Sequence, residues 1–282
     1  MVVVTPTAPA VGSRRRHDRE SGGLRRGSAV GLGLSLIWLS LIVLIPLAAV
    51  AVKSSDNGWS GFWTTLSSPE VAAALRLTIG EALVVTVVNV VMGTLIAWVL
   101  VRDDFPGKTI FELVIDVPFA LPTIVAGLVL LSMYGPQSPV GLHLANTRVG
   151  IFVALLFVTV PFVVRSVEPV LIELDRDAEE AAASLGAGRL TVFRRIVLPN
   201  LLPAIAAGAA LSFARAVSEY GSLVLLSGNL PFKTQVASVK ILSLIESDNP
   251  GGAAAVATVL LVVAIVTLIA IDLLQRWAAR RA

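Results

Sequence analysis

Long apolar stretches alternate with short polar segments along the whole chain. The hydrocarbon core of a bilayer is about 30 Å thick, so a helix that crosses it needs roughly 20 mostly apolar residues. Six stretches meet this requirement, the fourth only by extending past Arg165. The pattern therefore predicts an all-α, polytopic membrane protein with six transmembrane helices, over residues 27–52, 77–101, 117–134, 149–167, 201–226 and 250–272.

Composition and charge agree with this class. Hydrophobic residues make up 56% of the 282-residue chain and charged residues only 15%, whereas a soluble protein carries about 25% charged residues. Basic residues concentrate before the first predicted helix, after the second and fourth, and after the last. Because Lys and Arg are enriched in cytoplasmic segments, we expect a bacterial cell (inner) membrane protein with both termini in the cytoplasm. The net charge of +3 then reflects topology and contact with anionic lipid, and we expect no nucleic-acid partner.

The segments outside the predicted helices contain no second domain. Residues 1–26 are polar without apolar periodicity and predict a disordered cytoplasmic tail. A cleaved signal peptide is the alternative, but the apolar run that follows exceeds the length of a signal core, about 7–15 residues. The outer segments are too short to fold alone, and Trp59, Phe62 and Trp63 in the first of them suit the membrane interface. Capture of a dilute substrate would therefore need a separate protein outside the membrane.

The longest cytoplasmic loop, residues 173–199, predicts a rigid helical projection. Asp177 and Glu180 have the spacing of a capping box, so a helix is expected to begin there. Gly186 suits a left-handed helix cap. A second short helix is expected to end at Pro199, which cannot donate a backbone hydrogen bond.

The second short helix would hold Leu190 and Phe193 near one face, where both side chains can fill a groove in another protein. An amphipathic helix lying on the bilayer is the alternative. The first helix argues against this alternative, because anionic lipid would repel its acidic residues, among them Asp177 and Glu179.

The loop also carries a spaced motif. It resembles the E-A-A-x3-G-x9-I-x-L-P signature of permease subunits in binding-protein-dependent ABC importers. The resemblance covers about residues 71–274 and implies a type I ABC importer permease domain, similar to molybdate and methionine permeases. It implies that the loop docks in a groove of an ATP-binding subunit, present in two copies, and that ATP and Mg bind there rather than in this chain. The residues that match the motif, and so receive this coupling role, are Glu180, Ala181, Ala182, Gly186, Ile196, Leu198 and Pro199.

Further segments resemble the sulfate/thiosulfate branch of the family, with T-type permease subunits as the best match. This resemblance implies a sulfate/thiosulfate importer, a homologous W-type permease as heterodimer partner and an extracytoplasmic sulfate-binding protein. A molybdate/tungstate importer is the alternative for the substrate. A gradient-driven carrier and a membrane scaffold without transport activity are the alternatives for the mechanism. The segments that carry the resemblance are residues 102–108, 121–127, 213–222 and 226–234.

The fifth predicted helix contains charged residues. Arg215 and Glu219 are four residues apart, hence on one helical face and able to pair. Charged groups inside a membrane usually face a cavity or another helix and are functional candidates. A structural ion pair that locks two helices is an equal alternative. The candidate residues for a pathway or gate are Arg215, Ser218, Glu219 and Tyr220.

The remaining polar residues do not predict a metal site or a catalytic site. Asn89 in the second helix is expected to form hydrogen bonds between helices. His143 has no second ligand nearby, so no metal site is expected. The fragment from Gly107 to Thr109 lacks the first glycine of a phosphate-binding loop, because Arg102 occupies that position. We therefore expect a permease without catalytic residues, with ATP hydrolysis in a partner chain.

Overall fold

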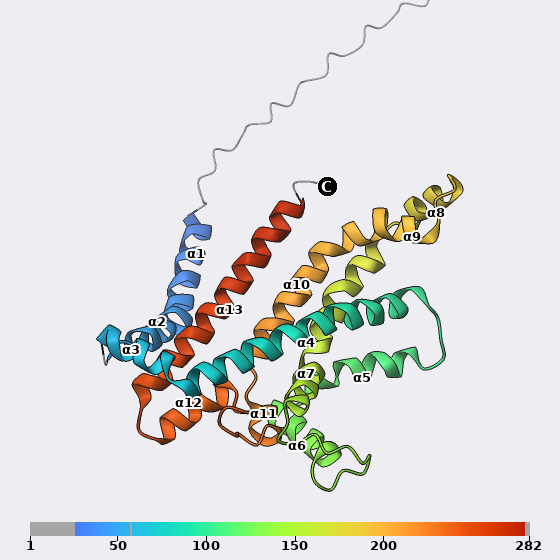
Figure 1. Ribbon diagram of the computed structural model, residues 1–282. Coiled ribbons are helices and arrows are strands. Elements are labelled where there is room, and N and C mark those ends of the chain that lie inside the picture. Colours follow the sequence, from blue (N-terminus) through green and yellow to red (C-terminus); the bar gives the residue numbers. More distant parts are fainter. Residues whose placement is uncertain (1–25, 57, 280–282) are drawn as a thin grey trace, which may run out of the picture. The chain divides into compact units, whose positions relative to one another are not determined.

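The computed structural model describes residues 26–56 and 58–279. All regular secondary structure in these residues is helical, which confirms the all-α prediction (Figure 1). The predicted tail, residues 1–26, lies outside the described residues except for Arg26. The chain divides into two compact units, one up to Ala48 and the other from Ala49 onward.

The first unit contains α1, a π-helical segment and the start of α2; the second contains the rest of α2 and all later elements. In chain order the elements are α1 (Arg26–Leu39), η1 (Ser40–Leu44), α2 (Ile45–Lys53), α3 (Gly58–Ser67), α4 (Pro69–Arg102), α5 (Lys108–Ala120), α6 (Thr123–Tyr134), α7 (Arg148–Glu173), α8 (Arg176–Ser184), α9 (Arg189–Val192), η2 (Phe193–Val197, π-helical), α10 (Leu198–Val217), α11 (Gly221–Leu226), α12 (Ala237–Glu246) and α13 (Pro250–Ala279).

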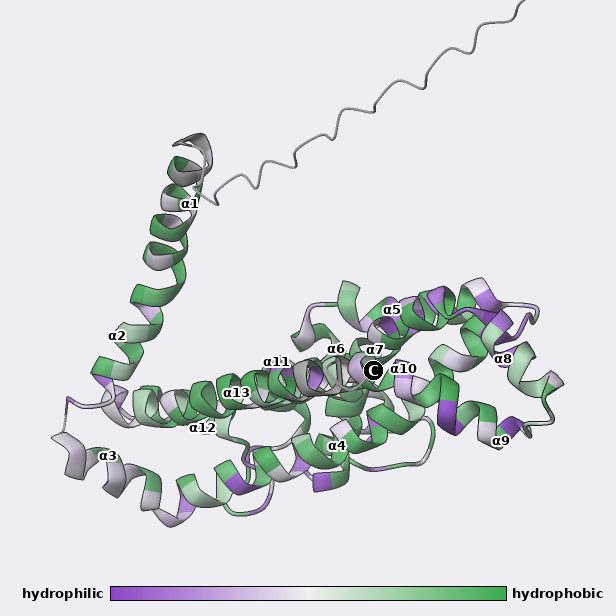
Figure 2. Ribbon diagram, turned by 90° about the horizontal axis from the view of Figure 1, so that it is seen from above, coloured by the Kyte–Doolittle hydropathy of each residue, from purple (hydrophilic) through white to green (hydrophobic). Residues whose placement is uncertain are grey.

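Five helical stretches among the described residues are long and apolar enough to cross a membrane, and α5 with α6 makes a sixth if this bent pair counts as one span. Figure 2 shows apolar residues dominating α4 and α13, with hydrophilic residues more frequent near α8 and α9. The five stretches are Val30–Lys53, Pro69–Arg102, Arg148–Glu173, Arg189–Val217 and Pro250–Leu273.

The prediction of one continuous helix over residues 117–134 is wrong. α5 ends at Ala120, and α6 begins at Thr123 after a bend of 116°. Leu121 between them is extended, with φ −88° and ψ 133°, because a residue before a proline is pushed out of the helical region and Pro122 follows it. The apolar pattern continues through the break, so periodicity alone does not reveal it.

Other helices also differ from the predicted ranges. The range 201–226 is interrupted, since α10 ends at Val217 and α11 begins at Gly221. The helix expected over 77–101 begins at Pro69 and has 34 residues, a length of about 51 Å at 1.5 Å per residue. The helix expected over 149–167 continues to Glu173. Both therefore extend beyond a hydrocarbon core of about 30 Å.

The centre of the second unit is a crossing of α4, α7 and α10 around Val163. A Cβ atom added to Gly93 on α4 would lie 2.8 Å from the Val163 Cβ, and one added to Gly208 on α10 would lie 2.8 Å from its Cα. Glycine is needed at both positions because the three backbones approach so closely. We call this region the three-helix crossing.

One helical turn from Val163, a polar network joins the same three helices. The Asn89 side-chain amide donates to Thr159 Oγ1 at 2.7 Å and to Ser212 Oγ at 3.0 Å. All three residues are fully buried. The prediction that Asn89 forms hydrogen bonds between helices is confirmed, and these bonds fix the relative rotation of α4, α7 and α10.

A second close contact joins the two short helices that follow the breaks. α6 and α11 lie side by side (Figure 1), and a Cβ atom on Gly127 of α6 would lie 2.7 Å from the Ser222 Cα of α11. At the same end, Lys240 of α12 pairs with Glu70 of α4 at 2.5 Å. The end of the second unit opposite α8 and α9 is thus built from broken helices and their loops (Figure 1).

Candidate coupling surface and membrane ion pair

The predicted projection consists of α8, the turn Leu185–Gly188 and α9, and we call this segment the knob. The N-cap residue of α8 is Asp175, whose side chain accepts a hydrogen bond from the Asp177 backbone N–H at 2.9 Å. The predicted start at a capping box of Asp177 and Glu180 is therefore wrong. Aspartate is a strong N-cap residue, and Asp175 takes this position directly before Arg176, the first residue of α8.

The turn of the knob confirms the predicted left-handed cap. Gly186 has φ +86°, a conformation that residues with a Cβ atom rarely adopt. Its N–H donates to the Ala183 carbonyl at 2.9 Å, and the Ala187 N–H donates to the Ala182 carbonyl at 3.0 Å. This pair of bonds is a Schellman motif, which ends α8 and reverses the chain within a few residues.

The prediction that a second short helix ends at Pro199 is wrong. α9, η2 and α10 form one continuous helix from Arg189 to Val217. Its π-helical turn places the Leu198 N–H on the Phe193 carbonyl, and such a turn shifts the hydrogen-bond register where Pro199 has no N–H to donate. The knob is therefore joined to α10 without a flexible loop.

Apolar side chains protrude from the knob. Leu185 is 90% exposed and Leu190 is 68% exposed, and Glu180 and Ala181 are exposed beside them. The sequence predicts that Phe193 also protrudes, and this prediction is wrong. Phe193 is half-buried, and its ring packs edge-on against Trp98 of α4 at 5.7 Å between centroids.

Few contacts tie the knob to the rest of the chain. Arg102, the last residue of α4, forms an ion pair with Glu179 of α8, and its guanidinium lies 5.3 Å from the centroid of the Trp98 ring. Next to this contact is a groove of about 340 Å³, whose lining includes Trp98, Glu179, Glu180 and Phe193. Sequence reasoning missed the ion pair because its partners are 77 positions apart.

The structure separates the residues of the spaced motif into two groups. Glu180, Ala181, Ala182 and Gly186 lie on the knob, and the first two and Gly186 are exposed while Ala182 is half-buried. The remaining three lie farther along the continuous helix, where the neighbouring Val197 and Leu201 belong to the buried core. They are Ile196 and Leu198, both half-buried, and Pro199, which is exposed.

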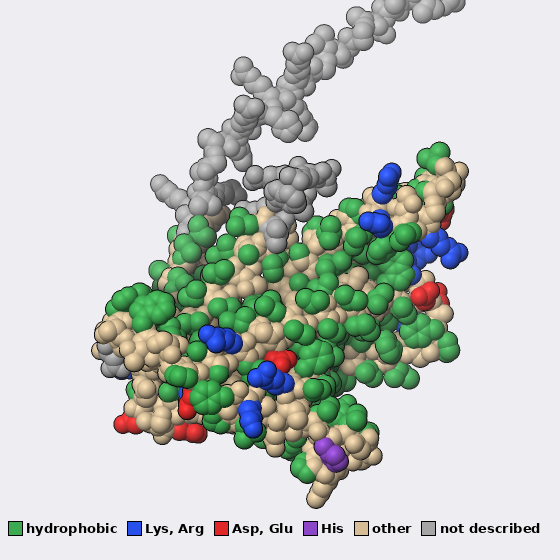
Figure 3. Space-filling model, viewed as in Figure 1, with side chains coloured by type: hydrophobic (Ala, Val, Ile, Leu, Met, Phe, Trp, Pro, Cys, Tyr) green, Lys and Arg blue, Asp and Glu red, His purple; other side chains and the backbone are tan. Residues whose placement is uncertain are grey.

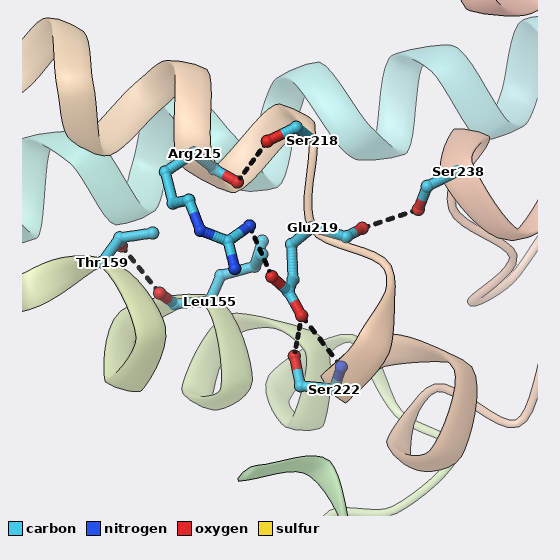
Figure 4. Close-up of polar contacts among 7 residues, drawn as sticks. All are labelled: Leu155, Thr159, Arg215, Ser218, Glu219, Ser222 and Ser238. Atoms are coloured by element: carbon cyan, nitrogen blue, oxygen red, sulfur yellow. Dashed lines mark hydrogen bonds and ion pairs between the residues drawn. The ribbon is translucent and has the colours of Figure 1, made fainter. Parts of the chain in front are cut away.

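The predicted pairing of Arg215 with Glu219 is confirmed. Arg215 Nη1 lies 2.7 Å from Glu219 Oε2, and the Glu219 side chain is fully buried. Glu219 Oε1 accepts hydrogen bonds from the Ser222 backbone N–H at 2.8 Å and from its hydroxyl at 2.9 Å, and Ser238 of α12 donates to the Glu219 carbonyl at 2.6 Å (Figure 4). Glu219 thus joins α10, α11 and α12.

The other two candidate residues of this region lie differently. Ser218 is exposed and donates to the Arg215 carbonyl at 3.1 Å, and Tyr220 is 38% exposed. Inside the chain, Arg215 pairs with the charge of the Glu219 carboxylate, and Ser222 donates both hydrogen bonds to its Oε1. This geometry favours the structural alternative, a lock between helices, over a free charge that attracts an anion.

Comparisons with known proteins agree with this architecture. The family model described as binding-protein-dependent transport system inner membrane component matches residues 89–282. The chain belongs to this family. The chain is also similar to the sulfate transport system permease protein CysT of Synechocystis, 45% identical over 88% of this chain and 90% of the relative. The corresponding protein of Salmonella typhimurium is 42% identical over 90% of this chain and 95% of the relative.

Solved structures show the same fold. A bacterial ABC transporter that imports alginate superimposes with a TM-score of 0.74 over 88% of this chain and 94% of that chain, at 17% identity. The MetNI methionine ABC transporter superimposes with a TM-score of 0.56 over 75% of this chain and 99% of that chain, at 18% identity. The chain is therefore a multi-pass membrane protein with the ABC importer permease fold predicted from its sequence.

Proposed function

We propose that the chain is the T-type permease subunit of an ATP-driven importer for sulfate and thiosulfate. The sulfate permeases that it resembles match almost its full length, which supports the substrate. The continuous helix from the knob into α10 carries the proposal of coupling, because a gradient-driven carrier has no need of an exposed docking projection. A molybdate or tungstate importer is the second candidate, and no feature of the structure favours it.

The proposed orientation places the knob and both termini in the cytoplasm of a bacterial cell, with the chain in the inner membrane. The bias of basic residues supports it. So does the fold, because the C-terminal end of α13 and the knob lie at the same end of the second unit (Figure 1). The loops around α6, α11 and α12 then face the outside.

The proposed partners are two ATPase subunits, a W-type permease and an extracytoplasmic sulfate-binding protein. The ATPase subunits hold ATP and Mg and perform hydrolysis, and this chain has no catalytic role. Leu185 and Leu190 of the knob fill a groove on an ATPase subunit, with Glu180, Ala181, Ala182 and Gly186 beside them. Ile196, Leu198 and Pro199 stiffen the helix behind the knob.

The proposed mechanism follows from the continuous helix that joins the knob to α10. When ATP draws the two ATPase subunits together, they displace the knob, and the helix transmits the displacement along α10 to Arg215 at its far end. Glu219 passes it to α11 and α12 through its bonds to Ser222 and Ser238. The outer end of the pathway then opens toward the binding protein, and ATP hydrolysis resets it.

Uptake of radiolabelled sulfate in cells that lack this chain, with and without the restored gene, tests the function. Thiosulfate and molybdate serve as competitors. Restored uptake that thiosulfate blocks and molybdate does not would support the sulfate importer. Loss of molybdate uptake with unchanged sulfate uptake would transfer the mechanism to the second candidate, and uptake that persists without the ATPase would support a gradient-driven carrier.

Substitution of Gly186 tests the coupling role. Gly186→Pro is incompatible with φ +86°, since proline fixes φ near −65°, so the knob should lose its shape and transport should stop while the chain stays in the membrane. Gly188→Ala is the matched control, because Gly188 has φ −68° and open space around its Cβ position. Normal transport by a membrane-inserted Gly186→Pro variant would contradict the docking role.

A further inference from the structure

A second charged region lies at the end of the second unit opposite the knob. It is a groove of about 530 Å³ between α4, the first residue of α7 and the loop before α12. Its charged lining is Arg76 and Glu81 from α4 and Arg148 from α7, and small residues such as Gly80 leave it open. Figure 3 shows basic side chains with an acidic one among them on a mostly apolar face, in the lower middle of the view.

The two arginines of this groove lack carboxylate partners. Among the described residues, Arg76 makes no hydrogen bond or ion pair. Arg148 donates from Nε to the Lys233 carbonyl at 3.1 Å, which orients its guanidinium and leaves both terminal nitrogens unused. Its charge attracts that of Glu81, the only acidic residue in the lining. Both arginines are exposed, so their guanidinium groups are accessible to an anion from solution.

The loop that orients Arg148 is strained and rigid. Phe232, which forms part of the groove wall, has φ +63°, an uncommon conformation for a bulky side chain. Three backbone N–H groups, of Lys233, Thr234 and Gln235, converge on the Leu230 carbonyl at 3.0–3.1 Å, and Thr234 and Gln235 are buried. Strain that the surroundings hold so firmly is typical of ligand-binding sites.

The position of the groove suits entry of a substrate. α7 begins at Arg148 and its other end leads to the knob, so its 26 residues separate the groove from the coupling surface by about 39 Å. The planar guanidinium fork is the side-chain group that best matches an anion with several oxygens. With Glu81 present, the groove carries one net positive charge, which favours weak retention and release rather than tight binding.

We propose that Arg76 and Arg148 hold a tetrahedral oxyanion as it enters the pathway from the binding protein, while Glu81 keeps the affinity low. This inference rests on the proposed function and names the residues of its entry site. A phosphate of a lipid headgroup offers the same chemistry as free sulfate, so the test must distinguish these two sources.

The test uses the complete transporter, with its ATPase, partner permease and binding protein, reconstituted in lipid vesicles. Arg76→Gln and Arg148→Gln are compared with Lys233→Gln, an exposed residue whose side chain does not line the groove. Each arginine variant should lower the sulfate transported per ATP about tenfold, the loss expected for one charge-assisted hydrogen bond. Stimulation of ATP hydrolysis by the loaded binding protein should remain, and Arg→Lys variants should recover part of the transport.

Three results would overturn the inference. The arginine variants could transport sulfate as well as Lys233→Gln does. They could lose the stimulation of ATP hydrolysis, in which case the arginines bind carboxylates of the binding protein. They could lose a co-purified phospholipid, detected by mass spectrometry, with unchanged sulfate transport, which would assign the groove to lipid phosphate.

Failure of the proposed function would look different. If the wild-type complex transported molybdate instead of sulfate, the substrate would be wrong, and a tenfold loss of molybdate transport in the same variants would still support the entry site. If the wild-type complex transported no oxyanion, both the function and the entry site would be wrong.

Discussion

The three-helix crossing and the knob belong to one continuous helix system but are built in opposite ways. At the crossing, Val163 is enclosed by Gly93 and Gly208, and Asn89 is hydrogen-bonded to two other helices. On the knob, Leu190 is 68% exposed. One ion pair, between Glu179 and Arg102, attaches the knob to α4, and Phe193, the residue after the knob, packs against Trp98 of the same helix.

This difference means that the stability of the chain and its coupling to an ATPase depend on different residues. Close packing with hydrogen bonds between buried polar side chains resists any change of side-chain volume or charge. An exposed projection contributes little to folding, so its apolar residues are available to a partner. Substitutions at the crossing and at the far end of α10 should therefore lower the stability of the chain, whereas substitutions on the knob should lower coupling and leave stability almost unchanged.

The largest loss of stability is expected from Glu219→Ala. It removes two hydrogen bonds to Ser222 and leaves Arg215 without its counter-charge. Breaking a buried ion pair by removing one partner costs about 3–5 kcal/mol. Unfolding of the purified chain in detergent measures the effect, and adding Arg215→Met should recover part of it. No recovery in the double variant would show that the charge of Arg215 is not the cause of the loss.

Gly93→Ala tests the packing of the three-helix crossing. The added methyl group would lie 2.8 Å from the Val163 Cβ, and overpacking of this kind costs about 1–3 kcal/mol. Gly80→Ala on the same helix is the control, because no atom lies within 4 Å of its Cβ position. It should leave stability unchanged or raise it by up to about 1 kcal/mol. Equal effects of the two substitutions would mean that the helices do not approach closely at Gly93.

Local features of this architecture could be predicted from the sequence, and tertiary ones could not. The left-handed cap at Gly186 follows from a glycine after a helix-forming segment, and the pairing of Arg215 with Glu219 follows from their spacing. By contrast, Arg102 and Glu179 are far apart in the sequence and carry no local sign of their contact. Close helix approach at Gly93 likewise depends on the partner helix.

Two prolines mislead a prediction from the sequence, in opposite directions. Leu121 precedes a proline, a recognised signal for leaving the helical region, but the surrounding run of apolar residues hid it. Pro199 predicts the end of a helix, but a π-helical turn accommodates it. Prolines in membrane-spanning helices are tolerated where neighbouring groups satisfy the freed backbone.

A smaller effect is expected where the knob joins α4. Arg102→Gln removes the ion pair with Glu179, whose side chains are 12% and 19% exposed, and should lower stability by about 1 kcal/mol. Hydrogen exchange of the α8 amides should accelerate while that of α7 stays unchanged. Lys108→Gln is the control, because its pair with Asp104 is long and exposed. Faster exchange in α7 as well would show that the knob and the crossing are one stability unit.

The smallest effect on stability and the largest on coupling are expected from Leu190→Ser. Its side chain is exposed, so stability should change by less than about 0.5 kcal/mol. Binding of the ATPase subunit should weaken about tenfold or more, because apolar anchors at the centre of an interface carry most of its energy. Leu142→Ser, at a leucine 54% exposed in the loop after α6, should leave ATPase binding intact.

Comparison of Leu190→Ser with Leu142→Ser shows whether the ATPase subunit binds the knob specifically or binds any exposed apolar side chain. If Leu142→Ser weakened ATPase binding as much as Leu190→Ser does, exposed apolar area at either end would matter, and the knob would lose its special role. If only Leu190→Ser weakened ATPase binding and the stability of the chain did not change, different residues would control binding and folding. The continuous helix from Arg189 to Val217 would then be the physical link through which a surface that adds nothing to folding controls the buried end of α10.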